Sequence, residues 1–449
     1  MSKIDGYASP VLSGFRWRRL FDQLQLLVVR AGATVAKFLL AIYTVRYLSL
    51  ADLGIYGLLV GATTIVPAVL GLGMTEWVMR KIVDLPRAQA LPMVVSRLGL
   101  TLCLHLVIQP LAFLLDILLG EPIPLPIALI SGAILMLENL GAQAADMLIA
   151  RGRVFLAYWI TFLRTGFWPI PVMVLGLLYP ETRTLEFVLL GWLAMLVVSW
   201  IVLFGLLLSK RRWRHARPHW GFLSQNLHGS LRLYVKDVSG TISAFLDRFL
   251  ISAFLGLELT GVYTLYWSIA SVMHSLAVFG VVQAQLPVLI AAGRSGDPKV
   301  FRVLERQLQI ELGGWALLLA LGTAVATPLF LPFLDQPLVQ DYLPVFWIVL
   351  GATLLRVAAD GYGFVLLALG RDRAIAAIAV AGAAASAVLN LILTPLAGLM
   401  GAAVAYVIVS GGLFAARYYF SQPMPSQTRP ATRVGEAKES EAETSQGVV

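Results

Sequence analysis

The chain has 449 residues, of which 59% are hydrophobic and only 13% are charged, with a formal net charge of +9. A soluble protein of this length carries roughly 25% charged residues, so the composition excludes an ordinary soluble domain. The single cysteine, Cys103, excludes an intramolecular disulfide and a multi-cysteine metal site.

Twelve apolar tracts fill most of the chain, and each is long enough to cross a bilayer. A helix needs roughly 20 apolar residues to span the hydrocarbon core, and its backbone groups must pair internally because lipid offers no partner. The tracts lie near residues 24–47, 54–75, 93–119, 125–149, 156–179, 185–208, 233–256, 262–292, 308–333, 343–369, 373–394 and 398–420. We therefore predict an all-α integral membrane protein with about 12 transmembrane helices.

Basic residues mark one side of this arrangement. Both terminal segments and the connections after the second, fourth, sixth, eighth and tenth spans are rich in lysine and arginine. The opposite connections hold only Arg183 and Arg46. By the positive-inside rule, we expect both termini in the cytoplasm. This distribution accounts for the net positive charge, so we expect no nucleic-acid partner.

The longest connection divides the chain into two parts. It covers residues 209–232 and contains the basic and aromatic run KRRWRHARPHWGF. We interpret it as a cytoplasmic linker between an N-terminal six-helix lobe at 1–208 and a C-terminal six-helix lobe at 233–420. The segment 421–449 is polar and rich in proline, serine and glutamate, which is typical of a disordered tail.

The two parts share short sequence matches. A shift of 207 residues places Leu48–Tyr56 on Leu255–Tyr263, and a shift of 218 places Gly152-Arg153 on Gly370-Arg371. Both matches fall at corresponding places in the predicted topology, although few identities are involved and chance similarity stays possible as an explanation. Repeats that run in the same direction are related by an axis along the membrane normal, with a site between them.

Span one carries two cations on one helical face. Arg30 and Lys37 are seven residues apart, so they lie about 20° apart around a helix. Cations are costly against lipid and are expected to face a wet interior or an anion. Arg30 lies near the helix start, where it can instead extend toward the cytoplasm. We favour a cavity position for Lys37 and leave both interpretations open for Arg30.

Span seven has a wide polar arc. Its two adjacent polar faces carry Lys236, Ser243 and Asp247 on the first and Asp237, Thr241 and Arg248 on the second. Two acid–base neighbours in one span indicate either a binding site or neutralisation by helices of the same half.

Other spans carry isolated charges. Arg356 and Asp360 lie one turn apart in span ten, the spacing of an ion pair, with a substrate or gating role as the alternative. In span five, Arg164 precedes Pro169 and Pro171, which should bend or break the helix. Arg164 is therefore a candidate for the wall of a cavity.

Carboxylates within spans either couple transport to an ion or act as counter-ions for the cations. Span four contributes two of them, and Arg164 or Lys37 are possible counterparts. The candidates are Glu138, Asp146, Asp237, Asp247 and Asp360.

Sequence signatures of catalysis are missing. The chain has no metal-ligand spacing of His, Cys and carboxylates, no P-loop and no nucleophile elbow. His105 and His274 lie alone in apolar tracts, where we expect interhelical hydrogen bonds. We therefore expect no metal, no cofactor and no enzymatic activity.

Several short segments, in this order along the chain, resemble one transporter family. They include Leu48–Tyr56, Phe245-Leu-Asp247-Arg248, Leu255-Gly256, Gly261-Val-Tyr263, Pro287, the Gly-Arg pairs and Gly398–Ala403. Over about residues 20–420 the chain is similar to the Wzx-type polysaccharide-transporter branch of the multidrug/oligosaccharidyl-lipid/polysaccharide (MOP) flippase superfamily. The resemblance implies a MATE/MOP-like fold, with two six-helix lobes in a V shape around a central cavity, in the cytoplasmic (inner) membrane.

The resemblance also implies a function. Such proteins move a polyprenyl-diphosphate-linked oligosaccharide, which is a repeat unit of exopolysaccharide, lipopolysaccharide O-antigen or capsule, from the inner to the outer leaflet by alternating access. Membrane lipids and other glycan-assembly proteins are the implied partners. A diphosphate needs cationic groups, and the candidates are Arg30, Lys37, Arg164, Lys236, Arg248 and Arg356.

Two alternative functions stay open. A cation-coupled multidrug exporter of the same superfamily needs carboxylates and aromatic rings in its cavity, and Asp247 and Asp360 fit it, whereas Arg30, Lys37 and Arg164 count against it. A membrane glycan polymerase or ligase needs a sizeable outer loop with catalytic residues. The predicted outer loops are short, which counts against that enzyme.

Overall fold

The computed structural model describes residues 17–83, 85–119, 124–208, 220–295 and 297–422, and these residues form helices with no strand among them. We call the part up to residue 208 the first half and the part from residue 220 the second half. The first half contains α2 (Trp17–Tyr47), α3 (Leu50–Gly71), α4 (Met74–Ile82), α5 (Arg87–Leu119), α6 (Leu125–Ala150), α7 (Val154–Phe162), the π-helix η1 (Leu163–Phe167), α8 (Pro169–Leu178), the 3₁₀ turn η2 (Pro180–Thr182) and α9 (Leu185–Leu208). The second half contains α10 (Trp220–Leu255), α11 (Leu257–Ser295), α12 (Pro298–Phe330), η4 (Leu331–Leu334), α13 (Pro337–Asp341), α14 (Leu343–Ala368) and α15 (Asp372–Ser421).

The predicted all-helical membrane fold is confirmed. Within the described residues, ten helices are long and apolar enough to cross a membrane. One of them, α15, has 50 residues, and it loses helical backbone geometry at Ala397 and Gly398. This kink divides α15 into the two spans expected at 373–394 and 398–420, while α2 covers the first expected span. The chain is therefore a multi-pass membrane protein.

Two elements differ from the sequence predictions. The nine-residue helix α4 was not expected, and it buries Met74, Val78 and Ile82 along one face. It is too short to span a membrane, so a search for long apolar tracts passes over it. In addition, α10 begins at Trp220, so the later part of the predicted linker 209–232 is helical. Residues 209–219 and 423–449 lie outside the described residues.

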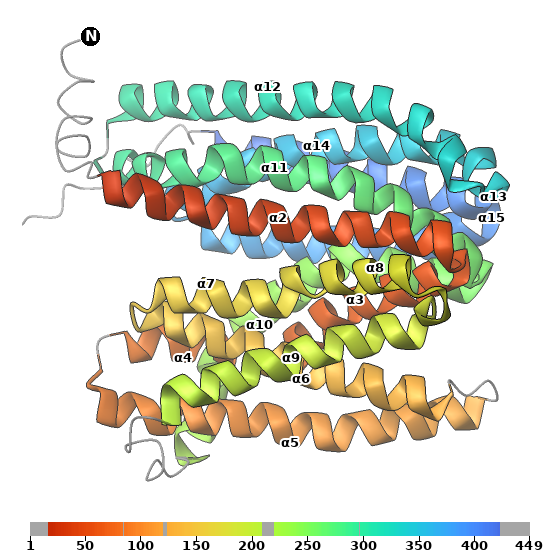
Figure 1. Ribbon diagram of the computed structural model, residues 1–449. Helices are drawn as coiled ribbons and strands as arrows, with labels where there is room; N and C mark the ends of the chain where they lie inside the picture. The colour runs from red at the N-terminus through yellow and green to blue at the C-terminus, as the bar shows by residue number, and fades with distance from the viewer. Residues whose placement is uncertain (1–16, 84, 120–123, 209–219, 296, 423–449) are drawn as a thin grey trace, which may run out of the picture.

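The helices run side by side in two groups (Figure 1). Helices α4–α9 lie together in the first group, and α11, α12, α14 and α15 lie together in the second. Helices α2, α3 and α10 contact both groups. We call the end of the bundle that carries Arg80, Arg151 and Arg371 the basic end, and the end where α2 stops and α13 lies the far end.

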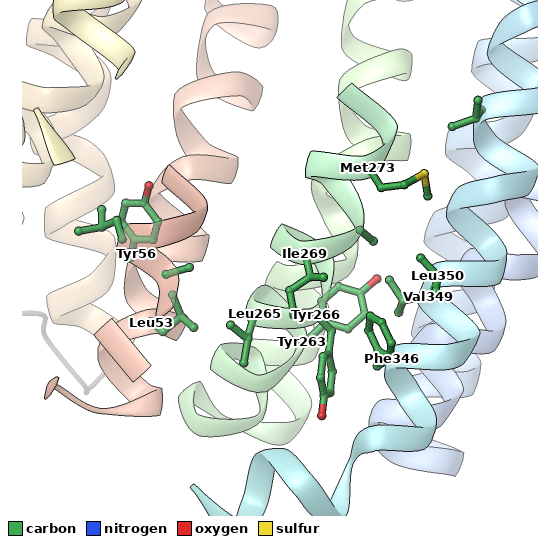
Figure 2. Close-up of a cluster of buried hydrophobic side chains, with 14 of the residues drawn as sticks. Leu53, Tyr56, Tyr263, Leu265, Tyr266, Ile269, Met273, Phe346, Val349 and Leu350 are labelled. Atoms are coloured by element: carbon green, nitrogen blue, oxygen red, sulfur yellow. The ribbon is translucent and has the colours of Figure 1, made fainter. Parts of the chain in front are cut away.

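The largest hydrophobic core lies along α11, which packs between α3 and α14. Figure 2 shows Tyr56 and Leu53 of α3 on one side of α11 and Phe346 and Val349 of α14 on the other. On α11, fully buried side chains are close together in the sequence, including Tyr263, which has no exposed surface. Because α11 is covered on several faces, it connects the first half to the interior of the second half.

Helix α3 crosses α11 through glycine contacts near the far end. A side chain on Gly54 would collide with the carbonyl oxygen of Leu257, and one on Gly261 would collide with the carbonyl oxygen of Leu50. The shift of 207 residues relates Gly54 to Gly261 and Leu50 to Leu257. Each contact is therefore the counterpart of the other. A two-fold relation between the two helices produces such a reciprocal contact.

The Gly-Arg pairs of the proposed repeat also occupy equivalent positions. Gly152 follows α6 with a φ of 72°, and Gly370 follows α14 with a φ of 66°. Positive φ angles favour glycine, because a Cβ atom would be strained there. The next helix, α7 or α15, starts two residues after the glycine in both cases.

We expect Gly261→Ala to destabilise the protein by about 1–3 kcal/mol, because the added methyl group would push apart two backbones that already touch. The apparent melting temperature of the purified protein in detergent checks this. Gly280→Ala is the matched control, since Gly280 lies in the same helix and has nothing within 4 Å of a built Cβ. The control should be neutral or stabilising, and equal melting temperatures for the two variants would contradict the prediction.

Polar contacts join the halves at both ends. At the far end, Arg46 forms an ion pair with Asp335, and Gln336 donates from Nε2 to the carbonyl of Val45 at 3.3 Å. At the basic end, the hydroxyl of Ser230 donates to the carbonyl of Leu72 at 2.8 Å. An exposed ion pair such as Arg46–Asp335 contributes at most about 1 kcal/mol, whereas Ser230 is buried and its backbone lies against that of Gly73.

Candidate functional site

A cavity of about 400 Å³ lies between the two halves. Helices α2, α3, α7 and η1 form its wall from the first half, and α10 and α11 form it from the second. Hydroxyl groups and aromatic rings dominate the wall, among them Thr34, Thr161, Thr264, Ser268, Tyr56 and Trp267. Within the described part of the chain, the charged residues of the wall are Lys37 and Arg248, and no carboxylate lines it. The cavity is therefore cationic.

Arg248 brings a buried guanidinium without a hydrogen-bond partner into this cavity. Only 1% of the residue is exposed, and its Nε, Nη1 and Nη2 atoms bond to none of the described residues. The guanidinium carbon lies 3.8 Å from the centroid of the Trp267 ring and 4.9 Å from that of Phe245. A guanidinium has five N–H donors and stays charged. Such a group, left without a hydrogen-bond acceptor in a cavity, suits a site for an anionic ligand.

Asp247 precedes Arg248 in the sequence but does not pair with its guanidinium. The Asp247 carboxylate accepts the Tyr263 hydroxyl at 2.6 Å and the backbone N–H of Arg248 at 2.9 Å. Tyr263 belongs to α11, in the same half. The acid–base pair that the sequence suggests is therefore divided. The acid is satisfied inside the second half, and the cation lines the cavity.

Lys37 lines the cavity from the opposite side. It projects from α2 on the face that also carries Ala33, Thr34 and Phe38, all of which line the cavity. Among the described residues, none forms an ion pair or hydrogen bond with Lys37. The structure thus brings one cation from each half into a single cavity.

Arg164 is placed beside this cavity and neutralised within the first half. Its Nη1 donates to the carboxylate of Glu138 and, at 3.1 Å, to the Glu138 carbonyl. The Trp192 indole donates to the same carboxylate at 2.9 Å. Both charged residues are buried. Arg164 lies on η1, and α8 begins at Pro169, so the irregular helix falls where the prolines predict it. Glu138 is the counter-ion of Arg164, and the Nε atom of Arg164 has no hydrogen-bond partner among the described residues.

Lys236 and Asp237 lie toward the basic end, outside the cavity wall. The Nζ atom of Lys236 is 3.7 Å from the Glu76 carboxylate of α4, and 42% of its side chain is exposed. The backbone carbonyl of Asp237 accepts the hydroxyl of Thr241 at 2.8 Å. Lys236 therefore links α10 of the second half to α4 of the first.

Asp360 is the centre of a charged cluster inside the second half. Its carboxylate accepts Nη1 of Arg417 at 2.5 Å and contacts Nε2 of His274 at 2.9 Å. The predicted partner Arg356 lies farther away, with Nε at 3.8 Å. The cluster joins α11, α14 and α15. It neutralises Asp360 and lies outside the wall of the cavity between the halves.

The remaining predicted residues are not in the cavity wall. Asp146 lies half-buried on α6, with no ion pair or hydrogen bond to a described residue. The backbone of Arg30 belongs to α2, and its side chain lies outside the described residues.

Sequence analysis also misses a buried cation, Arg97 of α5. It has no exposed surface, and it donates to the Thr101 hydroxyl at 2.7 Å, to the Gly71 carbonyl at 3.1 Å and to the Thr75 hydroxyl at 3.1 Å. These neutral acceptors tie α5 to the turn between α3 and α4. Because Arg97 lies near the basic end of its helix, its sequence position is the same as that of an ordinary loop cation.

No family model matches the chain, and no curated protein sequence matches it. Solved structures do match. One is a multidrug resistance MATE family transporter of the MOP superfamily in an inward-facing conformation, with 14% identity, a TM-score of 0.67, and coverage of 93% of this chain and 96% of that chain. Another is the lipid II flippase MurJ in an inward closed conformation, with 12% identity, a TM-score of 0.70, and coverage of 89% and 88%.

A third match is a MOP superfamily transporter from Pyrococcus furiosus, whose structure is described as having a binding pocket of reverse polarity. It is 14% identical, has a TM-score of 0.59, and the match covers 89% of this chain and 94% of that chain. At such low identities the matches establish the fold alone. The chain has the MATE- and MurJ-like fold of the MOP superfamily.

Proposed function

We propose that the chain is a transporter that moves a polyprenyl-diphosphate-linked oligosaccharide from the inner to the outer leaflet of the cytoplasmic membrane. The observation that carries this proposal is the unpartnered guanidinium of Arg248 in a cavity that it shares with Lys37 and with no described carboxylate. The lipid II flippase among the structures of the same fold supports a lipid-linked substrate.

The two cations suit a diphosphate. Arginine presents a planar fork of donors that matches two phosphate oxygens, and lysine adds a mobile point charge. Arg248 and Lys37 belong to different halves, so one diphosphate between them would bridge the halves. The hydroxyl groups of Thr34, Thr264 and Ser268 would then face the sugar attached to it.

The position of the cavity between the halves supports an alternating-access mechanism. The lobes at 1–208 and 233–420 would rock against each other about the α3–α11 crossing, while the polyprenyl tail stays in the bilayer. With the basic end in the cytoplasm, the headgroup would enter from that end and leave at the far end. An inside-negative membrane potential favours this direction by about 2.3 kcal/mol per charge per 100 mV.

The composition of the cavity wall counts against an exporter of organic cations. Such a site needs carboxylates or open aromatic faces. The carboxylates of Asp247 and Asp360 were the residues that favoured such an exporter. Both carboxylates are already bound within the second half, Asp247 by Tyr263 and Asp360 by Arg417. The most favourable ring, Trp267, is already covered by the Arg248 guanidinium.

A deletion strain tests the proposal. Loss of the gene should cause lipid-linked oligosaccharides to accumulate on the cytoplasmic face, and the wild-type gene should reverse this. Arg80→Met should also complement, because Arg80 is exposed and pairs with Glu76 at the basic end. Lys37→Ala should complement poorly. A deletion strain with normal glycan lipids, or one that only becomes sensitive to organic cations, would overturn the proposal.

A further inference from the structure

A second hollow, of about 730 Å³, lies within the second half at the basic end. Helices α11, α12 and α14 and the end of α15 enclose it, and it shares no lining residue with the cavity between the halves. We propose that this hollow binds the headgroup of a membrane phospholipid that carries both a phosphate and a primary ammonium group, as phosphatidylethanolamine does. This binding is independent of the proposed transport function.

The hollow lies at the depth of lipid headgroups. Helix α12 has 33 residues and is about 50 Å long, whereas the hydrocarbon core is roughly 30 Å thick. Its first turns carry Lys299, Arg302, Glu305 and Arg306, and its uninterrupted apolar sequence begins at Leu312, after Glu311. The charged turns therefore lie in the interfacial layer, and Arg302, Glu305 and Arg306 form one wall of the hollow.

Two arginines on this wall are suited to a phosphate. Arg302 and Arg306 are one turn apart and both line the hollow. Neither takes part in an ion pair or hydrogen bond with a described residue. Like charges at this spacing repel each other by a few tenths of a kcal/mol, and a bridging anion removes that repulsion.

Further polar groups line the hollow, among them the carboxylates of Asp297 and Glu305 and a third arginine, Arg371. Asp297 accepts the backbone N–H of Lys299 at 2.9 Å, and Arg371 donates to the carbonyls of Phe420 and Gln422, so both already have partners.

Glu305 lines the hollow between Arg302 and Arg306 and has no ion pair within 4 Å among the described residues. The buried Nε2 of Gln309 has no hydrogen-bond partner there. Residues 302, 305, 306 and 309 share one helical face. The arginines and the amide can hold a phosphate while Glu305 holds an ammonium, which selects a headgroup with both charges over a purely anionic one.

An apolar track continues from the hollow toward the membrane interior. Ile310 lines the hollow and is 61% exposed, and Leu317 and Leu321 lie below it with more than half of their surface exposed. Their spacing places them on one stripe of α12. Acyl chains attached to a headgroup in the hollow would lie along this stripe. The combination of a charged hollow and an apolar track favours a lipid over a soluble phosphate compound.

The test uses the purified full-length chain in detergent, titrated with phosphatidylethanolamine, phosphatidylglycerol or phosphatidylcholine. Retained lipid is counted by native mass spectrometry, and stability is followed by thermal unfolding. Phosphatidylethanolamine should be retained most and should raise the melting temperature most. Arg302→Gln/Arg306→Gln should weaken its retention by at least about tenfold. Glu305→Gln should remove its preference over phosphatidylglycerol.

The matched control is Arg294→Gln/Lys299→Gln. It removes the same charge at the same end of the second half from residues outside the hollow, so it should keep the lipid preference. Equal losses in the control and in Arg302→Gln/Arg306→Gln would show only general surface attraction. Stronger retention of phosphatidylglycerol by the wild type, or equal stabilisation by free phosphoethanolamine, would also overturn the proposal. Because Arg302 and Arg306 are exposed, the variant Arg302→Gln/Arg306→Gln should still fold. Gln309→Leu provides a second variant at the same site.

Discussion

Arg248→Met is expected to abolish transport without lowering the melting temperature. The guanidinium has no hydrogen-bond partner among the described residues, so its removal leaves no protein group unsatisfied. A buried charge costs several kcal/mol, and its stacking on Trp267 returns about 2 kcal/mol or somewhat more, so the stacking offsets only part of that cost. Methionine fills a similar volume with a flexible apolar chain. Stability should therefore stay the same or rise.

The loss of transport has a separate cause. Each hydrogen bond from a charged group to a diphosphate contributes about 1.5–3 kcal/mol, so losing even one reduces binding about 10-fold to 150-fold. Uptake of a labelled lipid-linked substrate in vesicles measures the effect. Arg248→Lys should restore part of the activity, because it keeps the charge but not the fork. A melting temperature that falls sharply in Arg248→Met would instead assign Arg248 a structural role.

Arg164→Met is expected to do the reverse and to destabilise the protein by about 3–5 kcal/mol, because it leaves the Glu138 carboxylate buried without its partner. Only 5% of Glu138 is exposed, and its other contact is the Trp192 indole. Thermal or denaturant unfolding of the purified protein measures the change.

A double variant separates the ion pair from the rest of the site. Glu138→Gln removes the orphaned charge but keeps an acceptor for Trp192, so Arg164→Met/Glu138→Gln should regain much of the lost stability. If the double variant is no more stable than Arg164→Met, the destabilisation does not arise from the unpaired carboxylate. Arg164 and Arg248 have equal formal charge and similar burial, yet their substitutions should act in opposite directions.

Sequence reasoning was most successful where the bilayer limits the possible structures. Apolar length places the spans, and the prolines after Arg164 predict the irregular helix there. The Gly-Arg pairs mark equivalent turns, since glycine alone adopts their backbone geometry easily. These features depend on residues that are close together in the chain.

The pairing of charges could not be predicted in the same way. The spacing of Arg356 and Asp360 predicts an ion pair along one helix, yet Arg417, 57 positions after Asp360, lies closer to the carboxylate. Helical periodicity gives the face on which a residue lies but not the helix that covers that face. For this reason Arg248 and Arg164 look alike in the sequence, and only the packing distinguishes a cation with a counter-ion from one without.

The reciprocal glycine contacts lie near the far end of α3 and α11. A rotation about these contacts therefore displaces the basic end of α11 much more than its far end. Helix α11 has 39 residues and is about 58 Å long. If it pivots by about 10° at Gly261, its opposite tip sweeps through about 10 Å, while the atoms around the pivot barely move. Touching backbones join the halves at both ends, Gly54 and Gly261 at the far end and Gly73 against Ser230 at the basic end. A rotation about the far-end crossing should consequently open the basic end widely, and the Gly73–Ser230 contact is one that such a movement must break.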